Sequence, residues 1–312
     1  MQAIGVDIGG TKIAAGVVSE DGEVLAHTRR DTDATQPAAI EQAVVDAVAE
    51  LRNEHEVGAV GVAAAGFVSP RRDRVLFAPN IAWRDHPLRD RLAADIDLPI
   101  VIENDANAAG WAEFRFGCGR DVEHMVMMTV GTGLGGAVIV DGHLLRGAFG
   151  AAGEIGHLRV VPDGHYCGCG HEGCWEMYAS GRALTRAARA SLITDADRTG
   201  ALVELAGGPG HKVKGPHVTD AAQEGDPLST ELLADLGRWV GEGAASLAAV
   251  LDPEMIVIGG GVGSAGPLLL EPARRGFLAQ LSARGHRPAA RIELAELGNE
   301  AGVVGAADLA RT

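Results

Sequence analysis

The stretch Gly150–Glu176, GAAGEIGHLRVVPDGHYCGCGHEGCWE, carries the densest chemistry in the chain. Three of the four cysteines, Cys167, Cys169 and Cys174, fall within eight residues, and His157 lies ten positions before the first of them. Three thiolates and one imidazole form a complete ligand set for tetrahedral Zn²⁺. Three clustered cysteines cannot all pair as disulfides, and nothing in the sequence indicates an oxidising compartment. The pattern therefore predicts a closed, structural zinc site.

Two carboxylates flank the predicted metal. Glu154 lies three residues before His157, and Glu176 lies two residues after Cys174. Carboxylates and imidazoles form hydrogen bonds with sugar hydroxyls, and an imidazole that binds zinc through one nitrogen keeps the other for such a bond. We therefore expect Glu154, His157 and Glu176 to bind a polyhydroxylated ligand. The alternative for each glutamate is a solvated surface charge.

Length and charge limit the class of protein. The chain has 312 residues, enough for two domains, and a formal net charge of −15, which argues against nucleic-acid binding. Asp7 interrupts the first apolar run before it is long enough for a secretory signal. No apolar run approaches the ~18–20 residues of a membrane span. We expect a cytoplasmic protein with reduced cysteines and no membrane or nucleic-acid partner.

The N-terminal region predicts a hairpin-rich unit. Its apolar runs and turns give the order strand, glycine turn, strand, hairpin turn and strand: 3–6, Gly9-Gly10-Thr11-Lys12, 13–18, Asp21-Gly22 and 23–26. A P-loop or a dinucleotide-binding fingerprint would continue from its glycines into a helix, so neither fits. The glycine turn can still cradle a phosphate through backbone N–H groups and the Thr11 hydroxyl, with Asp7 facing the phosphate through a metal ion. The alternative is a plain β-turn.

The same order recurs after residue 123. The segments are an apolar run at 124–130, the glycine turn 131–136 with Thr132 and Gly133, a run at 137–140, Asp141-Gly142 and a third run at 143–145. Two such turns in one chain indicate a duplicated α/β unit that holds nucleotide phosphates between its halves.

Between the two repeats, a strand at 98–102 leads into Glu103-Asn104-Asp105 and a helix at 106–116. An Asp or Asn before a helix is most often an N-cap. The alternative is that a carboxylate at the C-terminal edge of a strand, in an α/β cleft, serves as a general base. Further elements are expected as follows: a helix at 37–50, a strand at 57–65 ending at Gly66, and a loop-rich segment at 67–83 that contains Asn80.

The second half continues with a helix at 178–190, a surface loop at 205–218 and a long helix at 227–251 with Asp226 as its N-cap. A strand at 255–258 ends in three glycines that would allow close approach of a flat ligand such as adenosine, or that form a plain strand-to-helix turn: Gly259, Gly260 and Gly261. A short alanine-rich helix at 300–309 closes the chain.

These motifs together resemble the ROK family of sugar kinases and sugar-responsive repressors, and within it the bacterial glucokinases. The resemblance rests on DIGGTK at 7–12, END at 103–105, GTGLGG at 131–136, the 153–176 stretch and, more weakly, GGGV at 259–262. It implies a duplicated actin-like ATPase and sugar kinase fold of class α/β, with two domains flanking a nucleotide and sugar cleft. The implied domains are 1–110 with 300–312, and 111–299.

The resemblance also implies the reaction, ATP-dependent phosphorylation of the 6-hydroxyl of glucose with Mg²⁺ and a structural Zn²⁺. Asp105 would be the base. Sugar contacts would come from Gly66, Asn80, Asn104, Asp105, Glu154, His157 and Glu176. Contacts to ATP and Mg²⁺ would come from Asp7, Gly9, Gly10, Thr11, Lys12, Thr132, Gly133, Gly259, Gly260 and Gly261. The metal ligands would be His157, Cys167, Cys169 and Cys174. A homo-oligomer, dimer or tetramer, is implied as well.

Three other functions compete with this one. The first is a kinase for another hexose, such as fructose, mannose or an N-acetylated amino sugar. The second is a sugar-sensing repressor, which is disfavoured because only six residues precede Asp7 and the charge is strongly negative. The third is a sugar-binding protein without activity, which Asp105 and the two glycine turns oppose. The sequence assigns no role to Cys118.

Overall fold

The computed structural model describes residues 1–10 and 12–312, which form two compact units. The first comprises Met1–Glu123, Ala137–Gly153 and Glu296–Thr312, and the second comprises His124–Gly136 and Glu154–Ala295. These divisions differ from the predicted ones at 110 and 299. Helix α3 runs without a break from Asp105 to Arg115, so a division at residue 110 would cut it. The chain also returns to the first unit at 137–153, which the linear motif pattern does not reveal.

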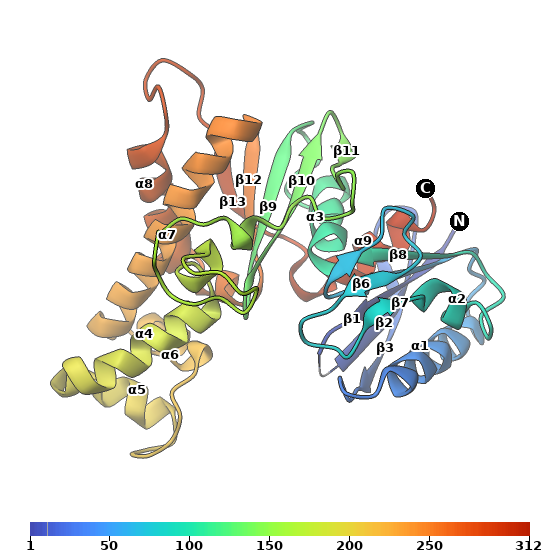
Figure 1. Ribbon diagram of the computed structural model, residues 1–312, viewed down its shortest axis with the longest axis horizontal. Helices are drawn as coiled ribbons and strands as arrows, with labels where there is room; N and C mark the ends of the chain where they lie inside the picture. The colour runs from blue at the N-terminus through green and yellow to red at the C-terminus, as the bar shows by residue number, and fades with distance from the viewer. Residues whose placement is uncertain (11) are drawn as a thin grey trace. The chain divides into compact units, whose positions relative to one another are not determined.

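The sheet of the first unit has the strand order β3-β2-β1-β4-β8 (Figure 1). Its strands are β1 (Ala3–Ile8), β2 (Lys12–Val18), β3 (Val24–Asp31), β4 (Val60–Ala64) and β8 (Ile100–Asn104). β1, β4 and β8 are parallel, whereas β2 and β3 form the predicted antiparallel hairpin. Gly22 has φ +83° in the hairpin turn, a conformation that glycine adopts without strain.

Helices cover the two faces of this sheet differently. On one face, α1 (Pro37–Arg52) buries Ile40, Val44 and Val48 in the same hydrophobic cluster as Ile4 and Val6 of β1. On the other face, α9 (Ala301–Leu309) packs directly on the strands. A Cβ at Gly5 would lie 1.8 Å from the Val303 carbonyl oxygen, and one at Gly61 would lie 1.8 Å from that of Ala306. Glycines in β1 and β4 therefore let the last helix seat against the sheet.

A small sheet of order β5-β6-β7 occupies the segment that the sequence predicted to be loop-rich. Its strands are β5 (Phe67–Val68), β6 (Val75–Phe77) and β7 (Arg84–His86), and α2 (Leu88–Leu92) follows. Strands of two or three residues are too short to show a period of two, which explains why the pattern gave no strand there.

The second sheet has the strand order β11-β10-β9-β12-β13. Its strands are β9 (Met125–Val130), β10 (Leu134–Val140), β11 (His143–Leu144), β12 (Met255–Gly259) and β13 (Arg291–Leu294). β9, β12 and β13 are parallel, as β1, β4 and β8 are in the first sheet. The order repeats that of the first sheet strand by strand, so the predicted duplication is confirmed.

Helices α4 (Gly181–Thr194), α5 (Gly200–Leu205), α6 (Gly215–Gln223), α7 (Pro227–Leu251) and α8 (Pro267–Gln280) belong to the second unit. Asp226 caps α7 by accepting a hydrogen bond from the Ser229 N–H (2.8 Å), as predicted. The predicted loop at 205–218 is wrong at its end, because α6 begins at Gly215 and buries Val218. Over the two described ranges, no helix combines the length and apolarity needed to cross a membrane.

Candidate functional site

Three parallel strands of the first sheet end at one edge. Several residues of the first unit that are predicted to bind the sugar or the cation lie at this edge. Asp7 is the penultimate residue of β1, Gly66 follows β4 by two residues, and Asn104 ends β8. The register aligns Ile8, Ala64 and Asn104 across the three strands, so Asp7 lies one residue before the line on which Asn104 lies. The carboxyl edge of parallel strands is where open α/β sheets place their ligands.

Asn104 serves as the helix cap, and Asp105 does not. Asn104 is the N-cap of α3: its Oδ1 accepts a hydrogen bond from the Asn107 N–H (2.9 Å). Its Nδ2 donates to the Gly66 carbonyl (3.0 Å), which links the ends of β8 and β4. Asp105 is the first residue of the helix and does not serve as the cap. Its carboxylate is therefore available for another role.

Asp7 and Asp105 interact electrostatically. Burial raises the pKa of Asp105, although the hydrogen bond from the Ala106 N–H to its Oδ1 (3.0 Å) opposes the shift. Burial and, second, the charge of Asp105 raise the pKa of Asp7 to about 7. Helix α9 contributes to this burial, since a Cβ at Gly302 would lie 2.6 Å from Asp7 Oδ2. Two enclosed carboxylates of this kind favour a proton or a cation between them.

The first glycine turn lies next to Asn80. The Gly9 N–H donates to the Lys12 carbonyl (2.9 Å), which closes the turn between β1 and β2. A Cβ at Gly10 would lie 3.8 Å from the Cβ of Asn80, so the predicted phosphate turn adjoins a predicted sugar contact. The Lys12 side chain is exposed. Thr11 lies outside the described residues.

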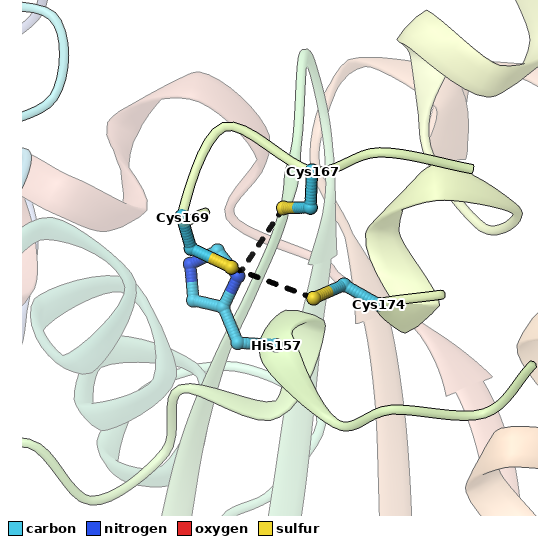
Figure 2. A group of neighbouring side chains, drawn as sticks. All are labelled: His157, Cys167, Cys169 and Cys174. Atoms are coloured by element: carbon cyan, nitrogen blue, oxygen red, sulfur yellow. Dashed lines mark hydrogen bonds between the residues drawn. The ribbon is translucent and has the colours of Figure 1, made fainter. Parts of the chain in front are cut away.

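The second unit brings together all four predicted metal ligands, His157, Cys167, Cys169 and Cys174. Their ligand atoms lie within 4.8 Å of one another, with Cys169 and Cys174 sulfurs 3.5 Å apart and the Cys167 sulfur 3.7 Å from His157 Nδ1. Figure 2 shows the sulfurs and the imidazole facing one small volume. Tetrahedral zinc with ordinary Zn–S and Zn–N bonds spaces its ligand atoms by about 3.5–3.8 Å. The donor set and its spacing therefore fit zinc, and the four positions are filled by protein.

Both predicted carboxylates adjoin this cluster. Glu154 immediately precedes the 3₁₀ turn Ile155–His157, and its carbonyl accepts a hydrogen bond from the His157 N–H (3.1 Å). Glu176 lies in the 3₁₀ turn Trp175–Met177, and its Oε1 accepts a hydrogen bond from the Cys167 thiol (2.9 Å). Its Oε2 would lie 2.7 Å from a Cβ at Gly133, so Glu176 also borders the second glycine turn.

Trp175 anchors the cluster to the long helix, a role that the sequence analysis did not identify. The side chain is fully buried, and its Nε1 donates to the Trp239 carbonyl in α7 (2.9 Å). A Cβ at Gly243 would lie 2.0 Å from the Trp175 ring, so only glycine fits at this point of α7. The two segments are more than 60 residues apart, and no local signal links them.

The second glycine turn opens into a cavity of about 800 Å³ within the second unit. The Gly131 N–H donates to the Gly133 carbonyl (3.0 Å), and the Gly131 carbonyl accepts from the Gly181 N–H at the start of α4 (2.8 Å). The lining comes from the turn, α4, α6 and the segment after β12: Gly131, Thr132, Gly181, Arg182, Leu184, Thr185, Arg186, Arg189, Gly215, Pro216, Thr219, Asp220, Gly261, Val262 and Ser264.

Of the three glycines after β12, Gly261 lines this cavity. Gly259 is the last residue of β12, and Gly260, with φ +84°, packs so closely that a Cβ would lie 2.6 Å from the Val130 carbonyl oxygen. The sequence analysis did not predict that α4 and α6 line this cavity. For α6 the reason is that residues 205–218 were predicted to form a surface loop. A proline in the first turn of a helix is a common start signal, and Pro216 provides one.

Comparison with known proteins agrees with this arrangement. The ROK family matches residues 3–312. A glucokinase from Streptomyces coelicolor is 48% identical over 308 residues, which cover 99% of this chain and 97% of the relative. An N-acetylmannosamine kinase from Escherichia coli is 36% identical, covering 100% and 99%. The crystal structure of a ROK family glucokinase from Streptomyces griseus in complex with glucose and AMPPNP has a TM-score of 0.92 at 48% identity, covering 100% and 99%. The chain therefore belongs to the ROK family.

Proposed function

We propose that this chain is a glucokinase that transfers the γ-phosphoryl group of ATP to the 6-hydroxyl of glucose. The observation that carries the proposal is the division of roles at the end of β8. Asn104 caps α3, which leaves the enclosed carboxylate of Asp105 free to accept a proton. The raised pKa of Asp105 suits a group that must take a proton from a sugar hydroxyl during transfer. The relatives named glucokinase supply the substrates.

The sugar contacts are assigned to both units. In the first, Asn80, Asn104, Asp105 and the Gly66 backbone would bind hydroxyls. One N–H of the Asn104 amide is committed to Gly66, and the other remains for the sugar. In the second, Glu154 and Glu176 would accept hydrogen bonds. His157 approaches Cys167 with Nδ1, so Nε2 is the nitrogen left for a hydroxyl.

The zinc site would hold this second set in place. His157, Cys167, Cys169 and Cys174 would bind the ion and supply no open coordination position, so its role is structural. His157 is itself one of the ligands, and Glu176 lies two residues after the ligand Cys174. Zinc would bind Cys167 as the thiolate, which has no proton to donate to Glu176, so the ion would act on Glu176 through the backbone. The ion would thereby fix the orientation of His157 directly and the position of Glu176 through the segment that carries Cys174.

The nucleotide is assigned to the cavity beside Thr132. A volume of about 800 Å³ lies in the range of pockets that enclose nucleotide-sized ligands. The turn at Thr132 and Gly133, together with Gly9, Gly10, Thr11 and Lys12, would contact the phosphates. Mg²⁺ would lie near Asp7, because a cation offsets the charge of two neighbouring carboxylates, Asp7 and Asp105. Magnesium commonly binds through one or two carboxylates plus substrate phosphates.

A coupled assay tests the proposal. Purified protein with ATP and Mg²⁺ is supplied with glucose, and glucose 6-phosphate is detected by its dehydrogenase. We expect product formation that requires both ATP and Mg²⁺. A second assay, which measures ADP release with glucose, mannose, fructose, N-acetylglucosamine and N-acetylmannosamine, tests the second candidate, a kinase for another hexose. That candidate is favoured by the E. coli relative, and a higher kcat/KM for any of these sugars than for glucose would establish it.

A cytoplasmic location and a homo-oligomeric assembly complete the proposal. The second is measured directly by light scattering on the purified protein.

A further inference from the structure

We propose that Glu103 is a positioning residue for phosphoryl transfer, which fixes the backbone that carries Asn104 and Asp105 and, through Arg146, the chain segment that leads to Glu154. This inference rests on the proposed function, because its consequence for the reaction is measured on the kinase. Glu103 itself is the residue before the cap of α3 and is 3% exposed. It is therefore enclosed by protein and does not contact substrate.

One carboxylate oxygen of Glu103 holds the start of α3. Its Oε1 accepts hydrogen bonds from the Asn104 N–H (3.1 Å) and from Asn107 Nδ2 (3.1 Å). Asn104 caps the helix through the Asn107 N–H, so Glu103, Asn104 and Asn107 form a closed set around the first turn. Asp105 is the residue between them. Its backbone is held by this turn, since it is the first residue of α3.

The other oxygen holds two arginines from separate loops. Glu103 Oε2 accepts a hydrogen bond from Arg146 Nε (2.8 Å) and lies 3.4 Å from Arg72 Nε. Arg72 follows β5, and its carbonyl accepts the Ile102 N–H of β8 (3.1 Å). Both arginine side chains are largely shielded, at 19% and 28% exposure, so the ion pairs are screened less than surface pairs.

Arg146 connects Glu103 to the chain segment that precedes Glu154. Its carbonyl accepts the Ala152 N–H (3.1 Å), two residues before Glu154. Within this segment Gly150 packs against β5, where a Cβ would lie 2.1 Å from the Val68 carbonyl oxygen. The segment is thus attached to the first unit at two points, Gly150 and the Arg146–Glu103 pair. Glu103 thus connects the segment 146–153 to the end of β8, where Asn104 and Asp105 lie.

Loss of the Glu103–Arg146 ion pair should misplace Asn104 and Asp105 on one side and the segment that leads to Glu154 on the other. In Glu103→Gln, the amide oxygen can still accept from the Asn104 N–H, but the NH₂ group faces Arg146 as donor against donor. We expect kcat/KM for glucose to fall about 10- to 100-fold, the range that small misplacements of reacting groups cost. Both kcat and the KM for glucose should change, whereas the KM for ATP should change less than threefold.

Glu113→Gln is the matched control. Glu113 is fully buried and lies on the same helix α3, but it accepts backbone N–H groups of Cys118, Glu296 and Leu297 at 3.3, 3.1 and 2.8 Å. Its loss should lower thermal stability and leave kcat and the KM for glucose within twofold of wild type below the melting temperature. The double variant Glu103→Gln/Arg146→Gln removes the unpaired guanidinium. Its kcat/KM should exceed the value obtained by multiplying the losses measured separately in Glu103→Gln and in Arg146→Gln, and a value equal to that product overturns the inference.

Hydrogen exchange provides a readout that needs no activity. In Glu103→Gln, amide exchange should accelerate together at 104–107 and at 146–153. In Glu113→Gln, it should accelerate at 117–119 and 296–297 instead. Unchanged exchange at 146–153 in Glu103→Gln overturns the inference whatever sugar the protein phosphorylates. Faster exchange with kinetics equal to those of Glu113→Gln also overturns it, because the pair is then only structural. A wild-type protein that phosphorylates none of the sugars refutes the proposed function, which the exchange pattern does not depend on.

Discussion

The two sheets have the same strand order but different chemistry at their ends. In the first, β8 leads at once into Asn104, Asp105 and helix α3. In the second, the corresponding strand β13 ends at Leu294, and the chain passes through Ala295 to Glu296, where it returns to the first unit. The apolar strands fix the topology of both halves. One or two residues after a strand decide whether its end carries a carboxylate with a raised pKa.

The glycine turns differ in a similar way. The first lies beside Asn80 and follows Asp7, a carboxylate whose pKa burial raises to about 7. The second borders a large cavity and Glu176. We infer that the two units differ in role beyond the sugar and phosphate contacts assigned to both: the first supplies the proton acceptor and the cation site, and the second supplies the nucleotide cavity and the sugar contacts beside the metal.

The largest effect is expected for Asp105→Asn, which keeps the shape of the side chain and removes the proton acceptor. kcat should fall by ~10²–10⁴-fold, the usual contribution of a general base. Burial raises the pKa of Asp105, which means that its ionised form is disfavoured in the folded protein, so the variant should be at least as thermally stable as wild type. Steady-state kinetics and a melting curve measure both. A kcat within tenfold of wild type would show that Asp105 is part of the helix start and nothing more.

The next effect concerns the zinc site. Cys169→Ser should free the segment that holds Glu154, His157 and Glu176, and thereby weaken glucose binding more than the loss of either glutamate alone. Cys118→Ser is the matched control, since Cys118 lies outside the cluster and contacts Glu113. Metal analysis should find about one zinc per chain in wild type and in Cys118→Ser, and much less in Cys169→Ser. Full glucose affinity in a zinc-free protein would refute the structural role.

A smaller effect is expected for Glu154→Gln. A hydrogen bond between a charged group and a sugar hydroxyl is worth ~1.5–3 kcal/mol, so the KM for glucose should rise tenfold or more while the KM for ATP stays nearly constant. Glu176→Gln should raise both KM values, because Glu176 also borders Gly133. Glu172→Gln, an exposed position in the same segment, is the control and should change neither. A collapse of ATP affinity in Glu154→Gln would contradict the assignment of the second unit.

The last effect is on stability and not on the reaction: it is a pH dependence of the free energy of unfolding. Folded Asp7 holds its proton up to about pH 7, whereas the unfolded chain releases it near pH ~3.9. Protonation therefore favours the folded state at low pH, and this advantage is lost as the pH rises from about 4 to about 7. Asp7→Asn lacks the ionisation, so its free energy of unfolding relative to wild type should increase over that interval and then level off. Denaturant unfolding in Mg²⁺-free buffer measures it, and a difference independent of pH would contradict the account.

Local patterns predicted a large part of this structure. The hairpins at Asp21-Gly22 and Asp141-Gly142, the cap at Asp226 and the metal cluster all depend on residues close together in the sequence, and each is present. The repeat of strand and turn signals also gave the duplication, because both sheets use the same apolar spacing.

The features that were missed depend on contacts distant in the sequence. The electrostatic coupling of Asp7 and Asp105 arises because β1 and β8 end at one edge of the sheet with β4 between them. The anchoring of Trp175 on α7 and the ion pair of Glu103 with Arg146 join segments that no local pattern connects. The glycines before α6 predict a loop there, and the burial of Val213 and Val218 depends on tertiary contacts that the local pattern does not show.

The division of work between the halves is tested most directly by calorimetric titration of glucose into Asp105→Asn and Glu154→Gln under the same conditions. The account predicts that Asp105→Asn binds glucose within a few fold of the wild-type affinity, whereas Glu154→Gln binds it at least about tenfold more weakly. The contradicting result is the reverse order, or an equal loss in both variants. Either would mean that proton acceptance by Asp105 and sugar binding by Glu154 are not separate roles.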